Sequence, residues 1–410
     1  MRSEVLRAML SAGLCLSAIA LMEAGVSGDD LAARARKLHF SSIVVDTHDD
    51  TTQRFLDGDF DLGPRNASGS IDIPRMKDGG LGAIFFSIWM PSKITGPEAV
   101  QRALIQIEDV RAQASKHSAD LMLATTAAEI RQARKQNKIA VLMGVEGGHM
   151  INSSLDVLDQ FAALGVRYMT LTHSGNSEWA DSSTDKPVHN GLTDFGKDVV
   201  REMNRLGVMV DISHVSDKTF RDVLETSKAP VIASHSSCRA ICDAPRNMTD
   251  DMMRALAAKN GVVQINYHVG FLSQEFRDAE KADPKINDAI AAEVHQRCGD
   301  KEGCQLIEGD KITREYVEQG KLPRVDWTKI IEHIDHAVKV AGVDHVGLGS
   351  DFDGANMPFG MEDATKLPKI TEALLRKGYA ESDVKKILGE NTLRVMTDVE
   401  RVSRELNAGK

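Results

Sequence analysis

Hydrophobic residues along the chain gather in eight short, nearly uninterrupted runs, each followed by an amphipathic stretch. Runs of this kind are typical of parallel strands that are buried on both faces. The stretches between them, such as DFGKDVVREMNRLG and DKTFRDVLETSK, have the spacing of surface helices. Eight β/α units in succession predict an α/β fold, a closed (β/α)8 TIM barrel rather than an open sheet. We expect its strands at residues 42–48, 82–89, 139–146, 167–173, 208–214, 230–235, 262–267 and 345–351.

Two longer connections interrupt this alternation, at residues 57–80 and 268–325. The second leaves the seventh strand at its carboxyl end, where barrels of this class carry their active sites. Insertions of this length are usually functional lids or disordered surface, and its charge excludes burial in the core. We expect a lid over the strand ends. Cys298 and Cys304 flank the polar turn GDKEG in this insertion, and we predict a disulfide between them.

Charge and the first residues of the chain bear on partners and compartment. The sequence of 410 residues has a formal net charge of −10 and no basic cluster with interleaved aromatic residues, which argues against nucleic acid as a partner.

Two arginines precede an uncharged run at residues 8–22, too short for a membrane span and suited to a signal peptide. An uncleaved anchor is the competing interpretation. We predict a signal peptide over about residues 1–25, export to the periplasm or the medium, and a single catalytic domain over residues 26–410.

Four of the predicted strands end in residues that commonly bind metal ions. The first closes with His48 and Asp50, which point to one face because side chains alternate along a strand. Glu146, His214 and His235 stand at the ends of the third, fifth and sixth strands. A single strand-end histidine or acid is more often a hydrogen-bonded structural residue. Five of them at one end of a barrel instead predict a metal site.

The number of these ligands favours two metal ions. A catalytic ion keeps an open position and takes few protein ligands. Glu146 would be shared, with His48 and Asp50 on one ion and His214 and His235 on the other. Imidazole and carboxylate ligands suit zinc, with manganese, cobalt or iron as alternatives. Two such ions hold a bridging hydroxide and polarise a carbonyl, which is what hydrolysis of an unactivated amide needs.

Two further cysteines and two further histidines are not expected to bind the metal ions. Cys238 and Cys242 follow His235 closely, but the ligand set is complete without them, so we expect structural or free thiols. His333 and His336 are expected on a helix surface.

Six motifs, in this order along the chain, resemble those of the renal (membrane) dipeptidase family: DTHDD, GVEGGH, LTHSGNSEWADS, DISHVSD, SHSS and GSDFDG. The resemblance runs from about residue 42 to residue 400, apart from the insertion. It implies a barrel of the metallo-dependent hydrolase (amidohydrolase) type with a binuclear zinc centre. It also implies a homodimer that hydrolyses dipeptides, in some members dehydropeptides, peptides with a D-residue at the carboxyl end, or β-lactams.

The resemblance implies roles for three further residues. His173, in LTHSGN, is similar to the histidine that polarises the substrate. Arg246, in APRNMTDD, is similar to the arginine that holds the terminal carboxylate of the substrate, a role suited to guanidinium geometry. Asp351, in SDFDG, is similar to the acid/base that passes a proton to the leaving amine. Asp353 is the alternative for that role, although a carboxylate that orients a ligand is the more common reading.

The chain departs from the pattern of the family near the site. Thr47 and Asp49 stand where glycine and asparagine are common, and Gly175 and Gln274 stand where cysteines are expected. We still predict an exported zinc-dependent dipeptidase. A lactam or a secondary-metabolite peptide is the alternative substrate for the same centre. A barrel that only binds a peptide-like ligand is the alternative class, and the complete ligand set argues against it.

Overall fold

The computed structural model describes residues 28–58 and 60–409, so the predicted signal peptide lies outside the described residues. The centre of the fold is a parallel sheet in the order β1-β2-β4-β5-β6-β7-β8-β9. All eight predicted strands are present, and the (β/α)8 barrel is confirmed. Their bounds are β1 Val44–Asp49, β2 Leu81–Trp89, β4 Ile139–Glu146, β5 Val166–Thr170, β6 Met209–Asp211, β7 Ile232–Ser236, β8 Val262–Ile265 and β9 Val346–Leu348.

The barrel closes between its first and last strands through a few main-chain contacts. Asp49 forms a parallel bridge with Phe352. The amide of Asp50 donates to the carbonyl of Phe352 at 2.9 Å, and the amide of Asp351 donates to the carbonyl of His48 at 3.0 Å. One further strand, β3 (Leu121–Leu123), pairs with the first residues of β4. Three residues are too few to show a strand period, which is why the hydrophobic pattern does not predict it.

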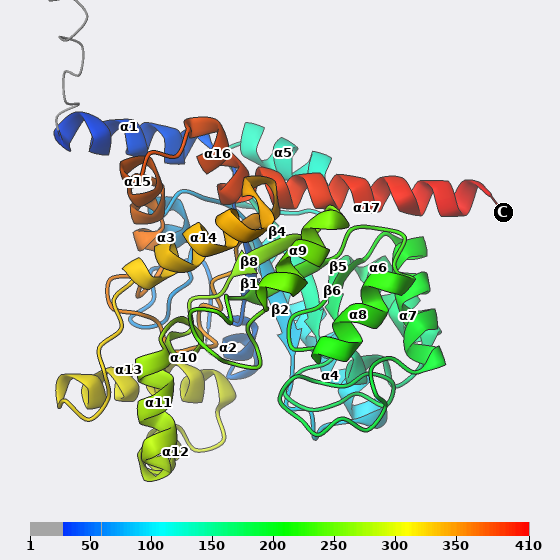
Figure 1. The fold of residues 1–410 in the computed structure, drawn as a ribbon, viewed down its shortest axis with the longest axis horizontal. Helices are drawn as coiled ribbons and strands as arrows, with labels where there is room; N and C mark the ends of the chain where they lie inside the picture. The colour runs from blue at the N-terminus through cyan, green and yellow to red at the C-terminus, as the bar shows by residue number, and fades with distance from the viewer. Residues whose placement is uncertain (1–27, 59, 410) are drawn as a thin grey trace, which may run out of the picture.

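Helices surround the barrel (Figure 1). Their starts and ends follow local capping chemistry. The helices α6 and α7 begin after Ser154 and Thr193, whose side chains accept backbone N–H groups, and each is followed by a glycine in the left-handed region, Gly165 and Gly207. The helices are α1 Gly28–Ser41, α2 Thr52–Leu56, α3 Ile73–Asp78, α4 Gly96–Lys116, α5 Ala127–Lys135, α6 Leu155–Leu164, α7 Asp194–Leu206, α8 Asp217–Thr226, α9 Asp250–Ala258, α10 Val269–Leu272, α11 Gln274–Ala282, α12 Pro284–Cys298, α13 Glu302–Glu318, α14 Thr328–Ala341, α15 Pro368–Arg376, α16 Glu381–Lys385 and α17 Asn391–Ala408.

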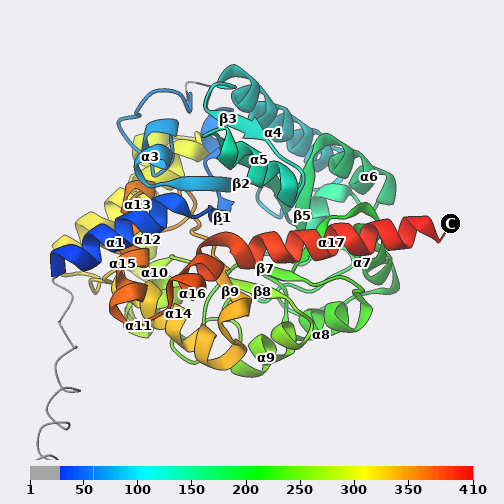
Figure 2. The ribbon, with the colours of Figure 1, turned by 90° about the horizontal axis from the view of Figure 1, so that it is seen from above.

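Among the described residues, the hydrophobic core of the barrel falls into two clusters. The larger lies mainly between the strands and the surrounding helices. The smaller fills the barrel interior, where Val45, Phe85 and Leu142 pack in one cluster with Leu393 and Met396 of α17. Figure 2 shows α17 crossing this end of the barrel. The opposite end of the barrel, where the strands have their carboxyl ends, is not covered by α17 and carries the polar residues. Among the described residues, no helix combines the length and the apolar character that crossing a bilayer requires.

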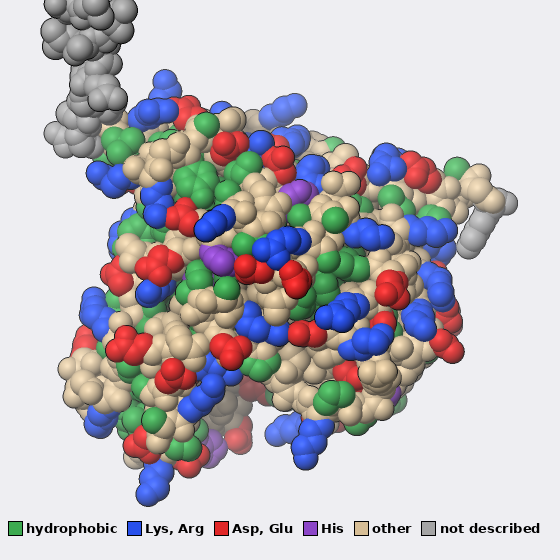
Figure 3. All heavy atoms as spheres, in the orientation of Figure 1, with side chains coloured by type: hydrophobic (Ala, Val, Ile, Leu, Met, Phe, Trp, Pro, Cys, Tyr) green, Lys and Arg blue, Asp and Glu red, His purple; other side chains and the backbone are tan. Residues whose placement is uncertain are grey.

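The long insertion forms a helical arm, defined here as α11, α12 and α13. In Figure 1 the arm lies on the same side of the barrel as α2, away from α1 and α17, and in Figure 3 it forms the lobe at the lower left. Cys298 at the end of α12 and Cys304 in the first turn of α13 form a disulfide, which confirms the predicted pairing.

Candidate active site and metal centre

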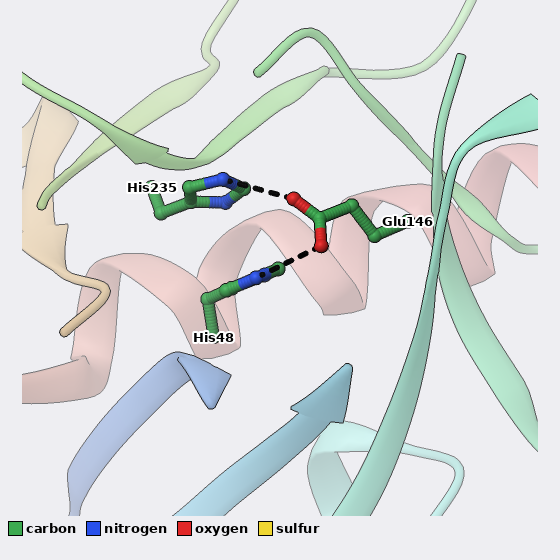
Figure 4. Close-up of side chains that lie close together, drawn as sticks. All are labelled: His48, Glu146 and His235. Carbon is green, nitrogen blue, oxygen red and sulfur yellow. Dashed lines mark ion pairs between the residues drawn. The ribbon is translucent and has the colours of Figure 1, made fainter. Parts of the chain in front are cut away.

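The five predicted ligands meet at the carboxyl ends of four strands, with Glu146 in the middle. Its Oε2 lies 3.4 Å from Nε2 of His48, and its Oε1 lies 2.8 Å from Nε2 of His214 and 3.2 Å from Nε2 of His235. Figure 4 shows the carboxylate beside His48 and His235, with one oxygen directed toward each ring. Oδ1 of Asp50 lies 3.6 Å from Nε2 of His48. The two oxygens of Glu146 therefore face two different groups, as a carboxylate shared by two ions would.

The donor atoms of this cluster fit a divalent metal. Nε2 of His48 and Oδ1 of Asp50 are buried and have no hydrogen-bond partner among the described residues. Buried polar atoms in native proteins are normally paired, because an unpaired one keeps its full desolvation cost. Imidazole nitrogen and carboxylate oxygen are ligands typical of zinc and related ions. A bound cation would satisfy both orphaned atoms.

The geometry also brings the two predicted catalytic residues to the metal ligands. Three groups of potential ligand atoms, each within 4.8 Å, occur in the part of the chain that the structure describes: His48, Glu146 and His235; Glu146, His173 and His214; and His48, Asp50 and Asp351. His173 and Asp351 thus border the two positions at which ions would bind. A substrate bound to those ions would lie against both side chains.

Hydrogen bonds behind the histidines orient them toward the centre. Nδ1 of His48 lies 2.8 Å from the hydroxyl of Tyr168 on β5, and Nδ1 of His235 lies 2.8 Å from the hydroxyl of Ser234. Gly144 on β4 makes room for the tyrosine, since a Cβ there would lie 1.9 Å from the ring of Tyr168. Partners of this kind fix the ring orientation of a ligand histidine and leave Nε2 for the metal.

Electrostatics favour an ionised Glu146 beside neutral imidazoles at His214 and His235. Burial raises the pKa of Glu146, but its histidine neighbours, His48 first, together outweigh this effect and hold the pKa well below the usual range. Burial lowers the pKa of His214 and of His235. Neutral imidazole and ionised carboxylate are the forms that bind metal ions.

Asp351 follows β9 and points into the site. Nδ2 of Asn266 donates to its Oδ2 at 2.8 Å. Burial raises the pKa of Asp351, but His235 and His48 outweigh this effect and lower the pKa below its ordinary value. The backbone φ is 66° at Asp351 and 68° at His214. Non-glycine residues in this left-handed region are uncommon and collect at functional sites, where the surrounding structure holds them.

Arg246, on the loop after β7, is buried with only part of its guanidinium paired. Nη2 donates to the carbonyl of His235 at 3.2 Å, whereas Nε and Nη1 have no partner among the described residues. The guanidinium carbon lies 5.3 Å from the ring centroid of Phe271. Burial lowers the pKa of Arg246 to about 10, so the side chain stays charged at neutral pH. A buried guanidinium with free N–H groups is suited to bind a carboxylate.

A cavity of about 400 Å³ connects Arg246 to the metal cluster. Sequence reasoning missed several of the side chains that line it. Trp89 ends β2, so its place at a strand end was an available signal, but His268 and Phe271 lie in the insertion, where no pattern marks them. The arm adds three more residues, Gln305, Leu306 and Gly309. The insertion therefore lies over the strand ends, as a lid would.

Asp353 lies outside this cavity and supports the first strand. Its Oδ2 accepts the hydroxyl of Thr51 at 2.8 Å, and its Oδ1 accepts the amide of Ser70 at 2.6 Å. These contacts hold the segment that follows Asp50. Cys238 and Cys242 are buried free thiols that belong to none of the metal groups among the described residues, as expected.

The prediction that His333 lies on a helix surface is wrong. Its side chain is 0% exposed, and Nδ1 accepts the amide of Cys238 at 3.0 Å. His333 shares the buried face of α14 with Ile330 and Ile334, so the apolar spacing around it was the relevant signal. His336 is partly exposed and lies 2.7 Å from Asp250.

Comparisons with known proteins agree with this geometry. The sequence model of the membrane dipeptidase family (Peptidase family M19) matches residues 32–410. The chain belongs to this family. It is 35% identical over 390 residues to Dipeptidase 3 of Macaca fascicularis, covering 92% of this chain and 70% of that protein. Membership in the family makes the protein a metal-dependent peptide hydrolase, as the sequence predicts.

Solved structures of related peptidases share the fold. The probable dipeptidase PvdM from Pseudomonas aeruginosa is 25% identical with a TM-score of 0.74, over 92% of this chain and 100% of that chain. A metallo peptidase from Rhodobacter sphaeroides, bound to a phosphinate mimic of the dipeptide L-Ala-D-Ala, is 26% identical with a TM-score of 0.72, over 87% of this chain and 99% of that chain.

Proposed function

We propose that this family member hydrolyses dipeptides with two zinc ions. The observation that supports the proposal most directly is the position of Glu146, whose oxygens lie 3.4 Å from His48 on one side and 2.8 Å from His214 on the other. Two divalent ions bound at these groups would lower the pKa of a shared water and polarise the peptide carbonyl.

The surrounding residues would bind the substrate and move the proton. Arg246 holds the carboxylate of the carboxyl-terminal residue, which restricts the enzyme to short peptides. Burial lowers the pKa of His173, so its neutral imidazole can donate a hydrogen bond to the carbonyl oxygen of the scissile bond. Asp351 accepts the proton of the attacking water and passes it to the leaving amine, which prevents expulsion of an amide anion.

Substrate stereochemistry, compartment and assembly form the finer part of the proposal. The L-Ala-D-Ala mimic bound by the Rhodobacter sphaeroides relative supports substrates with a D-residue at the carboxyl end. The disulfide between Cys298 and Cys304 supports export, because disulfides persist in oxidising compartments. The resemblance to membrane dipeptidases supports a homodimer, which light scattering of the purified protein would test.

Metal analysis and a substrate panel test the function together. Elemental analysis should give two zinc ions per chain, and activity removed by chelation should return when zinc is added back. L-Ala-L-Ala and L-Ala-D-Ala should be cleaved, and their carboxyl-terminal amides should not. Full activity with one ion per chain would contradict the binuclear centre. Failure to cleave any dipeptide in the zinc-loaded state would contradict the function itself.

A further inference from the structure

One face of α13 forms a wall of the substrate cavity. Gln305, Leu306 and Gly309 line the cavity together with the metal ligands. Gly309 follows Leu306 by three positions and Gln305 by four, and residues at these spacings lie on the same side of a helix, so these three form a continuous surface. The barrel strands contribute none of it, because α13 belongs to the insertion between β8 and α14.

The first turn of α13 is docked on α2, which directly follows the ligands of β1. The amide of Cys304 donates to Oδ2 of Asp57 at 2.8 Å. Gly303 packs against the backbone of α2 so closely that a Cβ there would lie 2.7 Å from Cα of Arg54. Glu302 also forms an ion pair with Arg102 of α4. The start of the wall is therefore fixed relative to the metal centre.

The middle of α13 is docked on the segment that follows β9. The amide of Met357 donates to Oδ1 of Asp310 at 2.8 Å, and Nη2 of Arg314 donates to the carbonyl of Met357 at 2.8 Å. Asp310 and Arg314 also pair with each other at 2.8 Å. These two docking points hold α13 against the segments that follow β1 and β9, where it forms a boundary of the cavity.

The docking points place this wall away from the carboxylate site. Arg246 lies on the loop after β7 and packs beside Phe271, which follows β8, whereas α13 rests on the segments after β1 and β9. A dipeptide with its carboxylate at Arg246 and its scissile carbonyl at the metal positions beside Glu146 would direct its amino-terminal residue beyond the metal cluster. The side chain of that residue would then face α13.

We propose that α13 selects the amino-terminal side chain of the dipeptide, with Leu306 as its apolar contact and Gly309 as the position that leaves room for it. A Cβ at Gly309 would meet no atom within 4 Å, so the space beside this glycine is open to the cavity. Dipeptides with a large apolar amino-terminal residue, such as leucine or phenylalanine, are the favoured class. The inference rests on the proposed dipeptidase function and assigns one end of the substrate.

The test fills the open space and varies each end of the substrate separately. Gly309→Leu should lower kcat/KM for Leu-Ala and Phe-Ala at least about 10-fold, the lower range for crowding an apolar pocket. The same variant should change kcat/KM for Gly-Ala, and for the series Ala-Gly, Ala-Leu and Ala-Phe, by less than about 3-fold. Glu318→Leu is the matched control, because it places leucine at an exposed position of the same helix and should leave both series unchanged.

Leu306→Ala provides a second, independent variant. It should reduce the preference for Leu-Ala over Gly-Ala by removing the apolar contact, with the melting temperature of the zinc-loaded protein close to that of the parent. A loss that falls on the Ala-X series, an equal loss across both series, or no change in Gly309→Leu would each overturn the inference.

Binding of inert analogues separates this inference from the proposed function. Phosphinate analogues of Leu-Ala and Gly-Ala are titrated calorimetrically into zinc-loaded parent and Gly309→Leu protein. If Gly309→Leu weakens binding of the Leu-Ala analogue but not of the Gly-Ala analogue, the result supports contact between α13 and the amino-terminal side chain, even if the parent cleaves no dipeptide. Equal affinities for both proteins overturn it even if the parent is an active dipeptidase.

Discussion

The hydroxyl of Tyr168 lies 2.8 Å from Nδ1 of His48, on the side of the imidazole that faces away from Glu146. This contact fixes the ring of the first-strand ligand from inside the barrel. Tyr168→Phe keeps the ring that fills the space beside Gly144 and removes only the hydroxyl. We expect metal affinity to fall by about 10- to 100-fold, the usual effect of losing a partner behind a ligand histidine. Competition with a chelator of known affinity measures the change.

Tyr267 provides the control for that experiment. It is also fully buried, and its hydroxyl has no hydrogen-bond partner among the described residues. Tyr267→Phe should therefore leave metal affinity unchanged. Equal effects in the two variants would mean that loss of any buried hydroxyl, rather than the contact with His48, loosens the metal.

Asp351→Asn should separate proton transfer from metal binding. Asparagine has nearly the same shape as aspartate but cannot accept the proton of the attacking water. We expect kcat to fall by about 10²- to 10⁴-fold, the range for losing a general acid/base. Metal content, measured on the same preparation, should stay at the parent value. A near-parent kcat in this variant would show that another residue transfers the proton. Loss of a metal ion would show that Asp351 is a metal ligand.

Arg246→Ala should act on substrate binding through the carboxylate. Removing the guanidinium should raise KM strongly for dipeptides and have little effect on the poor cleavage of their amides, because the amides lack the group that Arg246 binds. Steady-state kinetics with matched free and amidated dipeptides measures this difference. If the parent enzyme cleaves both forms equally well, Arg246 does not recognise the carboxylate.

His333 should make stability depend on pH. Burial lowers the pKa of His333 to about 4, and its Nδ1 must stay unprotonated to accept the amide of Cys238. Since the unfolded histidine titrates near pH 6.5, the stabilisation is complete above that pH and is lost as the pH falls toward 4. The loss amounts to about 3 kcal/mol at most. Urea unfolding of the metal-free protein at pH 7 and pH 4.5 measures it, and His333→Gln should lose less over this interval than the parent.

The order of elements and the set of ligands could be predicted because both depend on local patterns. His48 and Asp50 share a face through strand alternation, and the strand ends of a parallel barrel meet at one edge whatever the loop lengths. The short strand β3 and the burial of His333 were missed for two different reasons. Three residues are too few to show a strand period, whereas the apolar spacing of Ile330 and Ile334 marked the buried face of α14 and was overlooked.

The finer geometry of the site could not be predicted from the sequence either. The left-handed backbone at His214 and Asp351 is set by the surrounding loops, because histidine and aspartate tolerate this conformation but do not require it. The contact of Leu306 with the cavity depends on how the arm docks, through Asp57 and Met357, which are far from Leu306 in the chain.

Closure of the barrel between β1 and β9 has a consequence for the order of events during synthesis. His48 and Asp50 are among the first folded residues to be made, but Asp351 and the main-chain bonds that fasten β1 to β9 come about 300 residues later. A nascent chain that has completed β8 contains all five predicted ligands, but it still has an open seam and lacks Asp351. The helix α13 contacts the segments that follow β1 and β9, and it is translated before β9. The arm is therefore already synthesised when β9 pairs with β1 and can contact both strands' following segments at once.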